Sequence, residues 1–241
     1  MTQAMRNFIK TIAIMLAALC GIGLLAGAGK PLPASAPRNW NATVTPTPQG
    51  GYLLGNPAAK TKLVAYISYT CPHCAHFEQE SDAQLRIGMI GPGKGSLEVR
   101  PFLRNVVDMT VTLLAECGPP SKFYGNHSAF LRRQSDWMAP LNDMGDAQKA
   151  RWSNPDFGAR MRAVASDLKL YEIMEKRGYE RPALDRCLAD KALADQLAKR
   201  TQDAVEKDNV QGTPSFTLDG VPLAGTYGWD TLKPQVEARL N

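Results

Sequence analysis

The fold is decided by one stretch, LVAYISYTCPHC at residues 63–74, and by the segment that follows it. The first part of this stretch is short, apolar and rich in β-branched and aromatic side chains, which predicts a buried strand. The next segment, residues 74–85, lacks Gly and Pro and carries Phe77 and Leu85 at helical spacing. We therefore expect a strand that leads into a helix beginning at or beside Cys71.

This placement predicts a reactive thiol. At a helix N-terminus, unpaired N–H groups and the positive end of the helix dipole stabilise a thiolate, so the pKa of Cys71 is expected to fall below about 8.5. Pro72 suits the first helical turn, where its missing N–H has no intrahelical partner. His73 adds a donor or a positive charge beside the sulfur. The candidate catalytic residues are Cys71, Cys74, His73 and Pro72, and together they indicate a redox-active dithiol.

The alternative for a C-x-x-C pair is half of a zinc site, which needs a second pair of ligands at similar spacing. Cys117 and Cys187 stand alone, and His76 and His127 do not recreate the spacing of a zinc finger. We expect neither a bound metal nor a cofactor. A redox-inactive module that holds Cu(I) or zinc with the dithiol and His73 remains the hypothesis from a different functional class.

The N-terminus differs in kind from the rest of the chain. Arg6 and Lys10 precede an uncharged apolar run at residues 11–27, and small residues follow at 26–28. Residues 1–28 are therefore predicted to be a signal peptide for export to the periplasm. The run is also near the lower length limit for crossing a bilayer, so an uncleaved anchor that tethers the protein to the inner membrane is the alternative.

Charge and size restrict the function. The net charge is +5, and removal of residues 1–28 would leave 26 basic against 23 acidic residues, or +3. No basic stripe interleaved with aromatic residues is visible, so nucleic-acid binding is not expected. The 241 residues can form one sizeable core, or one core with an inserted subdomain.

Export also affects whether the cysteines are expected to form disulfides. Four remain after residues 1–28, and thiols in an oxidising compartment are expected to pair. Spacing suggests Cys71 with Cys74 and Cys117 with Cys187. The second pair would close a loop of about 70 residues and contribute about 4 kcal/mol as a structural disulfide. Two buried free thiols are the alternative, because spacing cannot establish connectivity.

Other segments outline the organisation of the chain. Residues 29–50 are rich in Pro, Thr, Ala and Asn and are expected to form an extended arm or tether. Asp108 is expected to cap a helix. The remaining predictions are a second strand at residues 97–103, a helical block at 108–208, a hairpin of 215–218 with 221–223 through Asp219-Gly220, and a final helix at 230–240.

Taken together, YTCPHCAHFE at residues 69–78, the helical block with its two cysteines, and GTPSF at residues 212–216 with its hairpin resemble the DsbA-like branch of the thioredoxin superfamily. The resemblance covers about residues 50–241. It implies an α/β, thioredoxin-like fold with an inserted helical subdomain. The thioredoxin-like domain would comprise residues 51–107 and 209–241, and the insertion residues 108–208.

The resemblance also implies a cis peptide bond at Thr213-Pro214, packed against the Cys71 sulfur, with backbone that pairs with substrate. From the residues alone, a trans proline entering an edge strand is the alternative. Thr213 and Pro214 are therefore the candidate substrate-binding residues. One departure is Ala65, which stands where related proteins often carry a buried carboxylate. A threonine before this proline, here Thr213, is more similar to the isomerase and reductase branches, although it also occurs in DsbA-like sequences.

The predicted function is an exported thiol:disulfide oxidoreductase that introduces disulfides into reduced or unfolded exported proteins. The family implies a quinone-linked membrane protein as the partner that reoxidises it. A disulfide isomerase or reductase on the same scaffold is the alternative. Such an enzyme would usually need a dimerisation domain, for which residues 29–57 are too short, so a monomer is expected.

Overall fold

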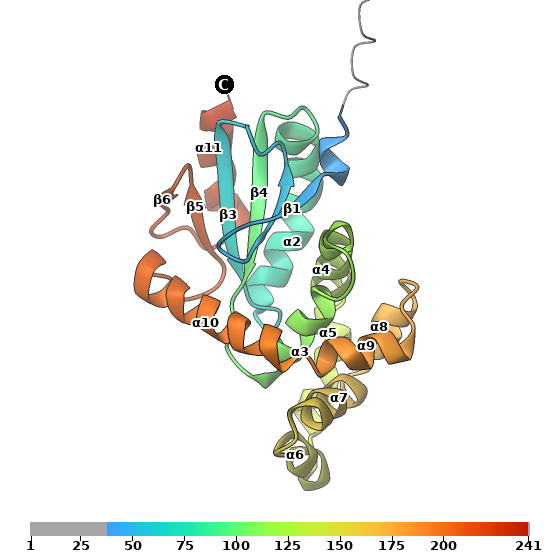
Figure 1. Cartoon of the computed structure of the whole chain (residues 1–241). Coiled ribbons are helices and arrows are strands. Elements are labelled where there is room, and N and C mark those ends of the chain that lie inside the picture. Colours follow the sequence, from blue (N-terminus) through green and yellow to red (C-terminus); the bar gives the residue numbers. More distant parts are fainter. Residues whose placement is uncertain (1–37, 241) are drawn as a thin grey trace, which may run out of the picture. The chain divides into compact units, whose positions relative to one another are not determined.

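The strand and helix expected around Cys71 are β3 (Thr61–Ile67), an inner strand of a mixed sheet, and α2 (Pro72–Leu85), which begins just beyond the end of β3 (Figure 1). The structure is a computed structural model and describes residues 38–240. The predicted export segment, residues 1–28, lies outside these residues. Among the residues described, no helix combines the length and hydropathy needed to cross a membrane.

The other elements follow in chain order. The remaining strands are β1 (Val44–Pro46), β2 (Tyr52–Gly55), β4 (Gly95–Pro101), β5 (Ser215–Leu218) and β6 (Val221–Pro222). The remaining α-helices are α3 (Val106–Ala115), α4 (Phe123–Arg132), α5 (Gln134–Met138), α6 (Asp146–Trp152), α7 (Phe157–Asp167), α8 (Leu170–Glu175), α9 (Arg181–Leu188), α10 (Lys191–Asp208) and α11 (Trp229–Leu240). Short 3₁₀ turns are η1 (Trp40–Ala42), η3 (Pro120–Lys122) and η4 (Ala139–Asp143), and η2 (Arg86–Ile90) is a π-helical turn.

Within residues 38–240 the strands form a six-stranded sheet in the order β1-β2-β4-β3-β5-β6. Only β3 and β4 are parallel, and they are joined through α2, as a parallel pair requires a crossover. β1 and β2 were not expected from the sequence. β1 lies within the segment predicted to be an extended arm, and it pairs with β2 at the edge of the sheet. The mixed α/β fold predicted from the sequence is confirmed.

The two faces of the sheet bury different partners. On one face, Phe77 of α2 packs against Phe216 of β5 with ring centroids 4.8 Å apart, and against Trp229 of α11 at 6.5 Å. On the other face, Tyr66 of β3 packs with Ala204 of α10 in a smaller cluster. β3 is therefore buried on both sides, which explains its nearly continuous apolar sequence.

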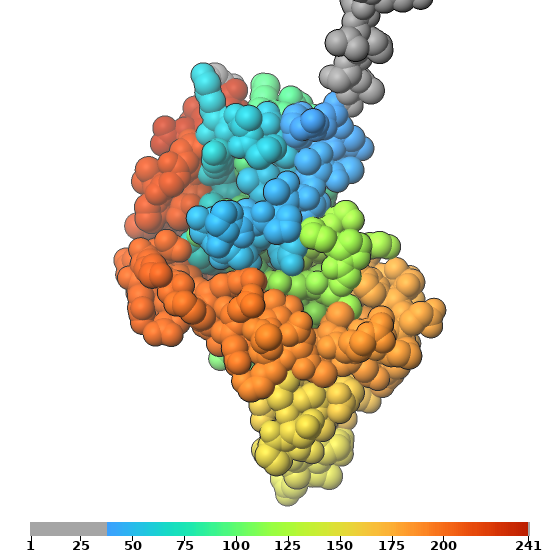
Figure 2. All heavy atoms as spheres, in the orientation of Figure 1, coloured from blue at the N-terminus to red at the C-terminus, as the bar shows by residue number. Residues whose placement is uncertain are grey.

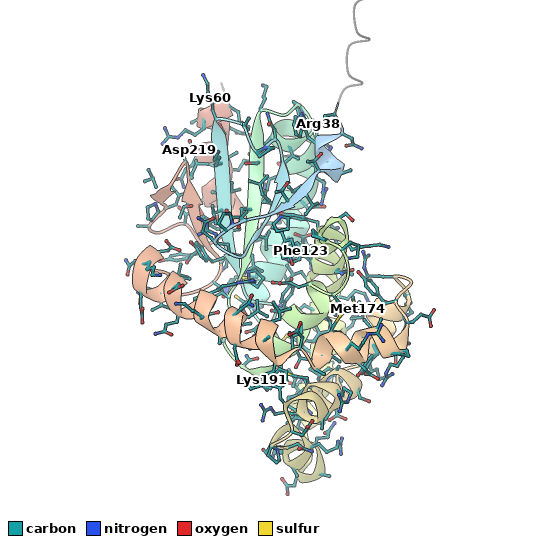
Figure 3. All side chains as sticks on the ribbon, in the orientation of Figure 1. Arg38, Lys60, Phe123, Met174, Lys191 and Asp219 are labelled. Carbon is teal, nitrogen blue, oxygen red and sulfur yellow. A yellow bond between two sulfur atoms is a disulfide. The ribbon has the colours of Figure 1, made fainter. Side chains whose placement is uncertain are left out.

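In the sequence, the helical block lies between β4 and β5. In the fold, α4 packs part of this block onto the sheet. Phe123, labelled in Figure 3, stacks on Tyr52 of β2 with centroids 4.0 Å apart. In the space-filling view, α6 and α7 form the yellow end of the block, farthest from the strands (Figure 2). One sequence expectation is wrong here: Asn105, not Asp108, caps α3, because the Asn105 side chain accepts from the N–H groups of Val107 and Asp108.

A disulfide joins Cys117, just after α3, to Cys187 in α9. The two residues are 70 positions apart in the chain, and their Cα atoms are 5.7 Å apart. Cys117 is buried and Cys187 packs at the margin of the main core. The bond therefore ties the two ends of much of the helical block together.

Replacing both Cys117 and Cys187 by Ser should lower the free energy of unfolding by about 4 kcal/mol, because a cross-link over a loop of this length restricts the unfolded chain. We would measure urea denaturation in a background with Cys71→Ser and Cys74→Ser, so that no thiol exchange occurs. The same background with both structural cysteines intact is the control. A loss below about 1 kcal/mol would show that the bond is dispensable.

Candidate active site

The two cysteines of the C-P-H-C motif occupy different environments. Both are free thiols in the structure. Cys71 is the N-cap of α2, with extended backbone angles, and its carbonyl accepts the first N–H groups of the helix from Cys74 at 3.1 Å and Ala75 at 3.3 Å. Cys74 is fully buried, whereas Cys71 retains 3% exposure. The more accessible sulfur is therefore the one at the helix N-terminus.

The second side of the site comes from the far end of the chain. The Thr213-Pro214 peptide bond is cis. The Cys71 thiol donates to the Thr213 carbonyl at 3.0 Å, across 142 positions of sequence. The Thr213 hydroxyl is buried and has no hydrogen-bond partner within the described chain, so it is available to a thiolate at Cys71.

The electrostatics separate the two sulfurs. The Cys74 thiol, hydrogen-bonded to the Cys71 sulfur, is the largest influence that lowers the pKa of Cys71, to about 4. Burial opposes this shift, and the Thr213 side chain and the backbone N–H groups of Cys74 and His73 support it. Burial raises the pKa of Cys74 well above its ordinary value. At neutral pH the reduced dithiol is thus a Cys71 thiolate over a Cys74 thiol.

The residues between the cysteines act mainly through the backbone. Pro72 is the first residue of α2, as expected for a position without an N–H partner. The side chains of Pro72 and His73 are both exposed, and it is the backbone N–H of His73 that stabilises the thiolate. His76, also exposed, lies 3.1 Å from Glu80 on the surface of α2.

Two buried carboxylates near the motif were not assigned to the site from the sequence. Ala65 leaves β3 without a carboxylate, but Asp108 of α3 reaches the loop before Cys71 and is fully buried. It accepts from the Thr70 N–H at 2.9 Å and from the Ser68 hydroxyl at 3.0 Å. Burial raises the pKa of Asp108. The signal in the sequence was an acidic residue three positions after a capping Asn.

The other carboxylate, Glu78, lies on α2 one turn beyond Cys74. It accepts a 2.5 Å hydrogen bond from Ser128 and lies 3.6 Å from His127 Nε2. The other ring nitrogen of His127 is hydrogen-bonded to the Tyr69 hydroxyl at 3.0 Å. These buried groups join α2 to α4, and His127 takes part in that packing.

The structure brings no further metal ligand to the dithiol. Among residues 38–240, no three His, Cys, Asp or Glu side chains are grouped as a metal site would require.

Two aromatic residues follow the hairpin and differ in exposure: Trp229 is buried against Phe77, whereas Tyr227 is exposed.

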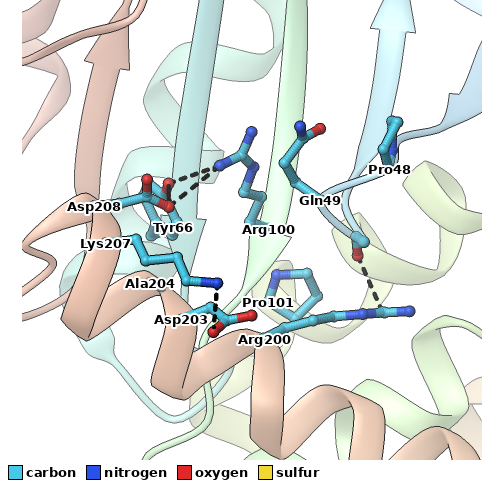
Figure 4. A pocket seen from close by; sticks show the side chains of 11 residues that line it. Pro48, Gln49, Tyr66, Arg100, Pro101, Arg200, Asp203, Ala204, Lys207 and Asp208 are labelled. Carbon is cyan, nitrogen blue, oxygen red and sulfur yellow. Dashed lines mark hydrogen bonds and ion pairs between the residues drawn. The ribbon is translucent and has the colours of Figure 1, made fainter.

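A separate hollow of about 280 Å³ lies on the face of the sheet that α10 covers (Figure 4). Its charged groups are already paired. Arg100 contacts the Tyr66 hydroxyl at 2.8 Å and Asp208 at 3.5 Å, and Arg200 donates to the Gly50 carbonyl at 3.0 Å. Neither cysteine of the motif lines this hollow. The hollow is therefore not part of the dithiol site.

Comparison with known proteins agrees with this geometry. A family model described as Thioredoxin matches residues 47–238. The chain belongs to the thioredoxin superfamily. Within this superfamily its fold is DsbA-like: the crystal structure of Wolbachia pipientis alpha-DsbA1 superimposes with a TM-score of 0.64 at 19% identity, covering 81% of this chain and 92% of that one. The family resemblance inferred from the sequence motifs is confirmed.

More similar in sequence is a crystal structure described as a protein-disulfide isomerase from Novosphingobium aromaticivorans. It is 55% identical, has a TM-score of 0.75, and covers 78% of this chain and 96% of its own. A protein of Rickettsia felis, provisionally named a protein-disulfide oxidoreductase, is 27% identical over 189 residues. That alignment covers 78% of this chain but only 59% of the relative's length.

Thiolate formation at Cys71 should be half complete near pH 4. The pKa falls to about 4 from 9.0, so the thiolate stabilises the reduced fold. This stabilisation is complete above pH 9 and is lost as the pH falls through about 4. Thiolate absorbance measured against pH, and the rate of alkylation by iodoacetamide, would report the midpoint. Cys74→Ala should raise it, because the strongest donor is removed. A wild-type midpoint above about 7 would contradict the assignment.

Thr213→Val should raise the pKa of Cys71 without changing the volume of the side chain. A hydrogen bond to a charged group contributes about 1.5–3 kcal/mol, which sets an upper limit of about one to two pKa units because water can replace part of it. The same absorbance titration would measure the shift. Thr217→Val, on β5 but outside the motif, is the matched control. An unchanged pKa of Cys71 in the Thr213 variant would show that the Thr213 hydroxyl does not stabilise the thiolate.

Proposed function

We propose that this protein is a thiol:disulfide oxidoreductase that introduces disulfides into exported proteins through Cys71 and Cys74. The observation that carries the proposal is the asymmetry of the dithiol: Cys71 lies at the N-terminus of α2 against Thr213 and has a lowered pKa, while Cys74 is buried and has a raised pKa. The names of the relatives support the same class of reaction.

The mechanism begins with the Cys71–Cys74 disulfide. A client thiolate attacks the Cys71 sulfur, a client–Cys71 disulfide forms, and Cys74 leaves and takes up a proton. A second client thiolate then attacks the client sulfur of this mixed disulfide, and Cys71 leaves as the thiolate. The client gains one disulfide by losing two electrons, and the enzyme keeps these electrons as its reduced dithiol.

The direction of the reaction follows from the stability of that product. Stabilising the Cys71 thiolate stabilises the reduced enzyme, so the couple becomes more oxidising. A low thiol pKa also makes Cys71 a good leaving group in the second step. Both effects favour an oxidase. The alternative, a disulfide isomerase, is supported by the name of the 55% identical relative.

Client proteins would bind beside the cis proline. The Thr213 carbonyl lies 3.0 Å from the Cys71 sulfur, so extended client backbone can pair there while its cysteine reacts. Next to it, a second hollow of about 280 Å³ is lined by residues that include Gly212, Leu223 and the exposed Tyr227. Such a surface suits a reduced or unfolded client rather than a small molecule.

The location and the redox partner follow from the same chemistry. An oxidising dithiol functions where disulfides persist, and the predicted signal segment directs the chain to the periplasm, either free as a monomer or tethered to the inner membrane. The reduced dithiol must pass two electrons on before another cycle. We propose that a membrane redox protein accepts them, as in the DsbA-like family.

The reduction potential of Cys71–Cys74, equilibrated with glutathione, should lie well above about −270 mV, the value for thioredoxin. The protein should oxidise a dithiol model peptide once per disulfide, and Cys71→Ser should abolish this reaction. Refolding of scrambled ribonuclease would be measured in parallel. A potential near or below the thioredoxin value, with efficient unscrambling, would assign the isomerase or reductase function instead. Stoichiometric metal in the reduced protein with no peptide oxidation would overturn both.

A further inference from the structure

The loop that presents Cys71 is held by side chains of the helical block. Asp108 accepts from the Thr70 N–H and from the hydroxyl groups of Ser68 and Thr70, at 2.9 to 3.0 Å. Asn105 donates to the Thr70 hydroxyl at 3.1 Å. These contacts satisfy three donors of the loop and one of its hydroxyl oxygens, but they leave its carbonyl groups to other partners.

Gln134 supplies one of those partners. It is the first residue of α5 and is 7% exposed. Its Nε2 donates to the Tyr69 carbonyl at 2.7 Å and to the Cys71 carbonyl at 2.9 Å. Because both partners are carbonyl oxygens, only the amide nitrogen can face them, and both of its N–H groups are used.

The position of these carbonyls gives Gln134 an influence on the sulfur. They belong to residues on either side of Thr70, whose own N–H is held by Asp108. The Cys71 carbonyl also accepts the first hydrogen bonds of α2, from Cys74 and Ala75. One side-chain nitrogen thus fixes the loop before the nucleophile and the first turn of the helix whose N–H groups stabilise it.

We propose that Gln134 is a positioning residue for the dithiol: through the Tyr69 and Cys71 carbonyls it holds the Cys71 sulfur against Thr213 and the N-terminus of α2. This inference rests on the proposed function, because it assigns Gln134 to the same exchange reaction. A merely structural Gln134 would satisfy two carbonyls and stabilise the oxidised and reduced proteins equally. A positioning residue favours the thiolate, and hence the reduced protein.

The test is Gln134→Met, which keeps the length of the side chain and removes both donors. We expect the rate of Cys71 alkylation near pH 4 to fall about twofold or more, as an upward shift of half a pKa unit would produce when the pH equals the starting pKa. At neutral pH the equilibrium with glutathione should shift toward oxidised protein by about threefold, the equivalent of the same half unit. Gln202→Met is the matched control, since the amide of Gln202 contacts only Glu206 on the exposed side of α10.

Gln134→Glu provides a second test of the proposal if the Met variant does not fold. Near neutral pH the new carboxylate would repel both carbonyl oxygens and the thiolate, so the shift of the glutathione equilibrium toward oxidised protein should equal or exceed that for Met. Unchanged alkylation and glutathione equilibria in a folded variant, with equal loss of stability in both redox states, would overturn the proposal. An ordinary pKa for Cys71 in the unmodified protein would instead refute the proposed function.

Discussion

The structure depends on the contact between the Cys71 sulfur and the Thr213 carbonyl, because this is where the two ends of the thioredoxin-like fold meet. One partner follows β3 at the start of α2, and the other precedes β5 by two residues. The antiparallel pairing of β3 with β5 places them at the same end of the sheet. A change in the register of that pairing would separate Thr213 from Cys71, and the sulfur would lose both the Thr213 carbonyl and the Thr213 side chain as neighbours.

The helical block supplies side chains that hold this site. Asp108, in its first helix, and Gln134, in its third, both reach the loop before Cys71, and neither lies near the motif in sequence. Glu78 and His127 join α2 to the same block. The chain therefore uses an insertion that interrupts the α/β unit to hold the most reactive part of that unit. The Cys117–Cys187 disulfide stiffens the block that makes these contacts.

The contacts around the dithiol set the charge of each of its sulfur atoms. The Cys74 thiol, the Thr213 side chain and backbone N–H groups lower the pKa of Cys71. The buried carboxylate of Asp108 is engaged by Thr70, Ser68 and the Arg104 N–H instead. Cys74 remains protonated because burial opposes its charge. An arrangement of this kind places the negative charge of the reduced dithiol on one sulfur, and the more strongly that thiolate is stabilised, the more oxidising the couple becomes.

Those parts of this protein that depend on a few neighbouring residues can be predicted from its sequence. Residues 63–85 specify a buried strand, a helix and a dithiol at their junction, since apolar periodicity, Pro72 at the first turn and the cysteine spacing act over a few residues. The Asp219-Gly220 hairpin is equally local, and both residues have the positive φ that its turn requires. The short strands β1 and β2 carry too few residues for a pattern, and their pairing depends on β4. The convergence of Thr213, Asp108 and Gln134 on Cys71 and the loop before it could be seen only in the folded structure. Their hydrogen bonds cross 38 to 142 positions of the chain, and single polar side chains carry no periodic signal that would announce such distant partners.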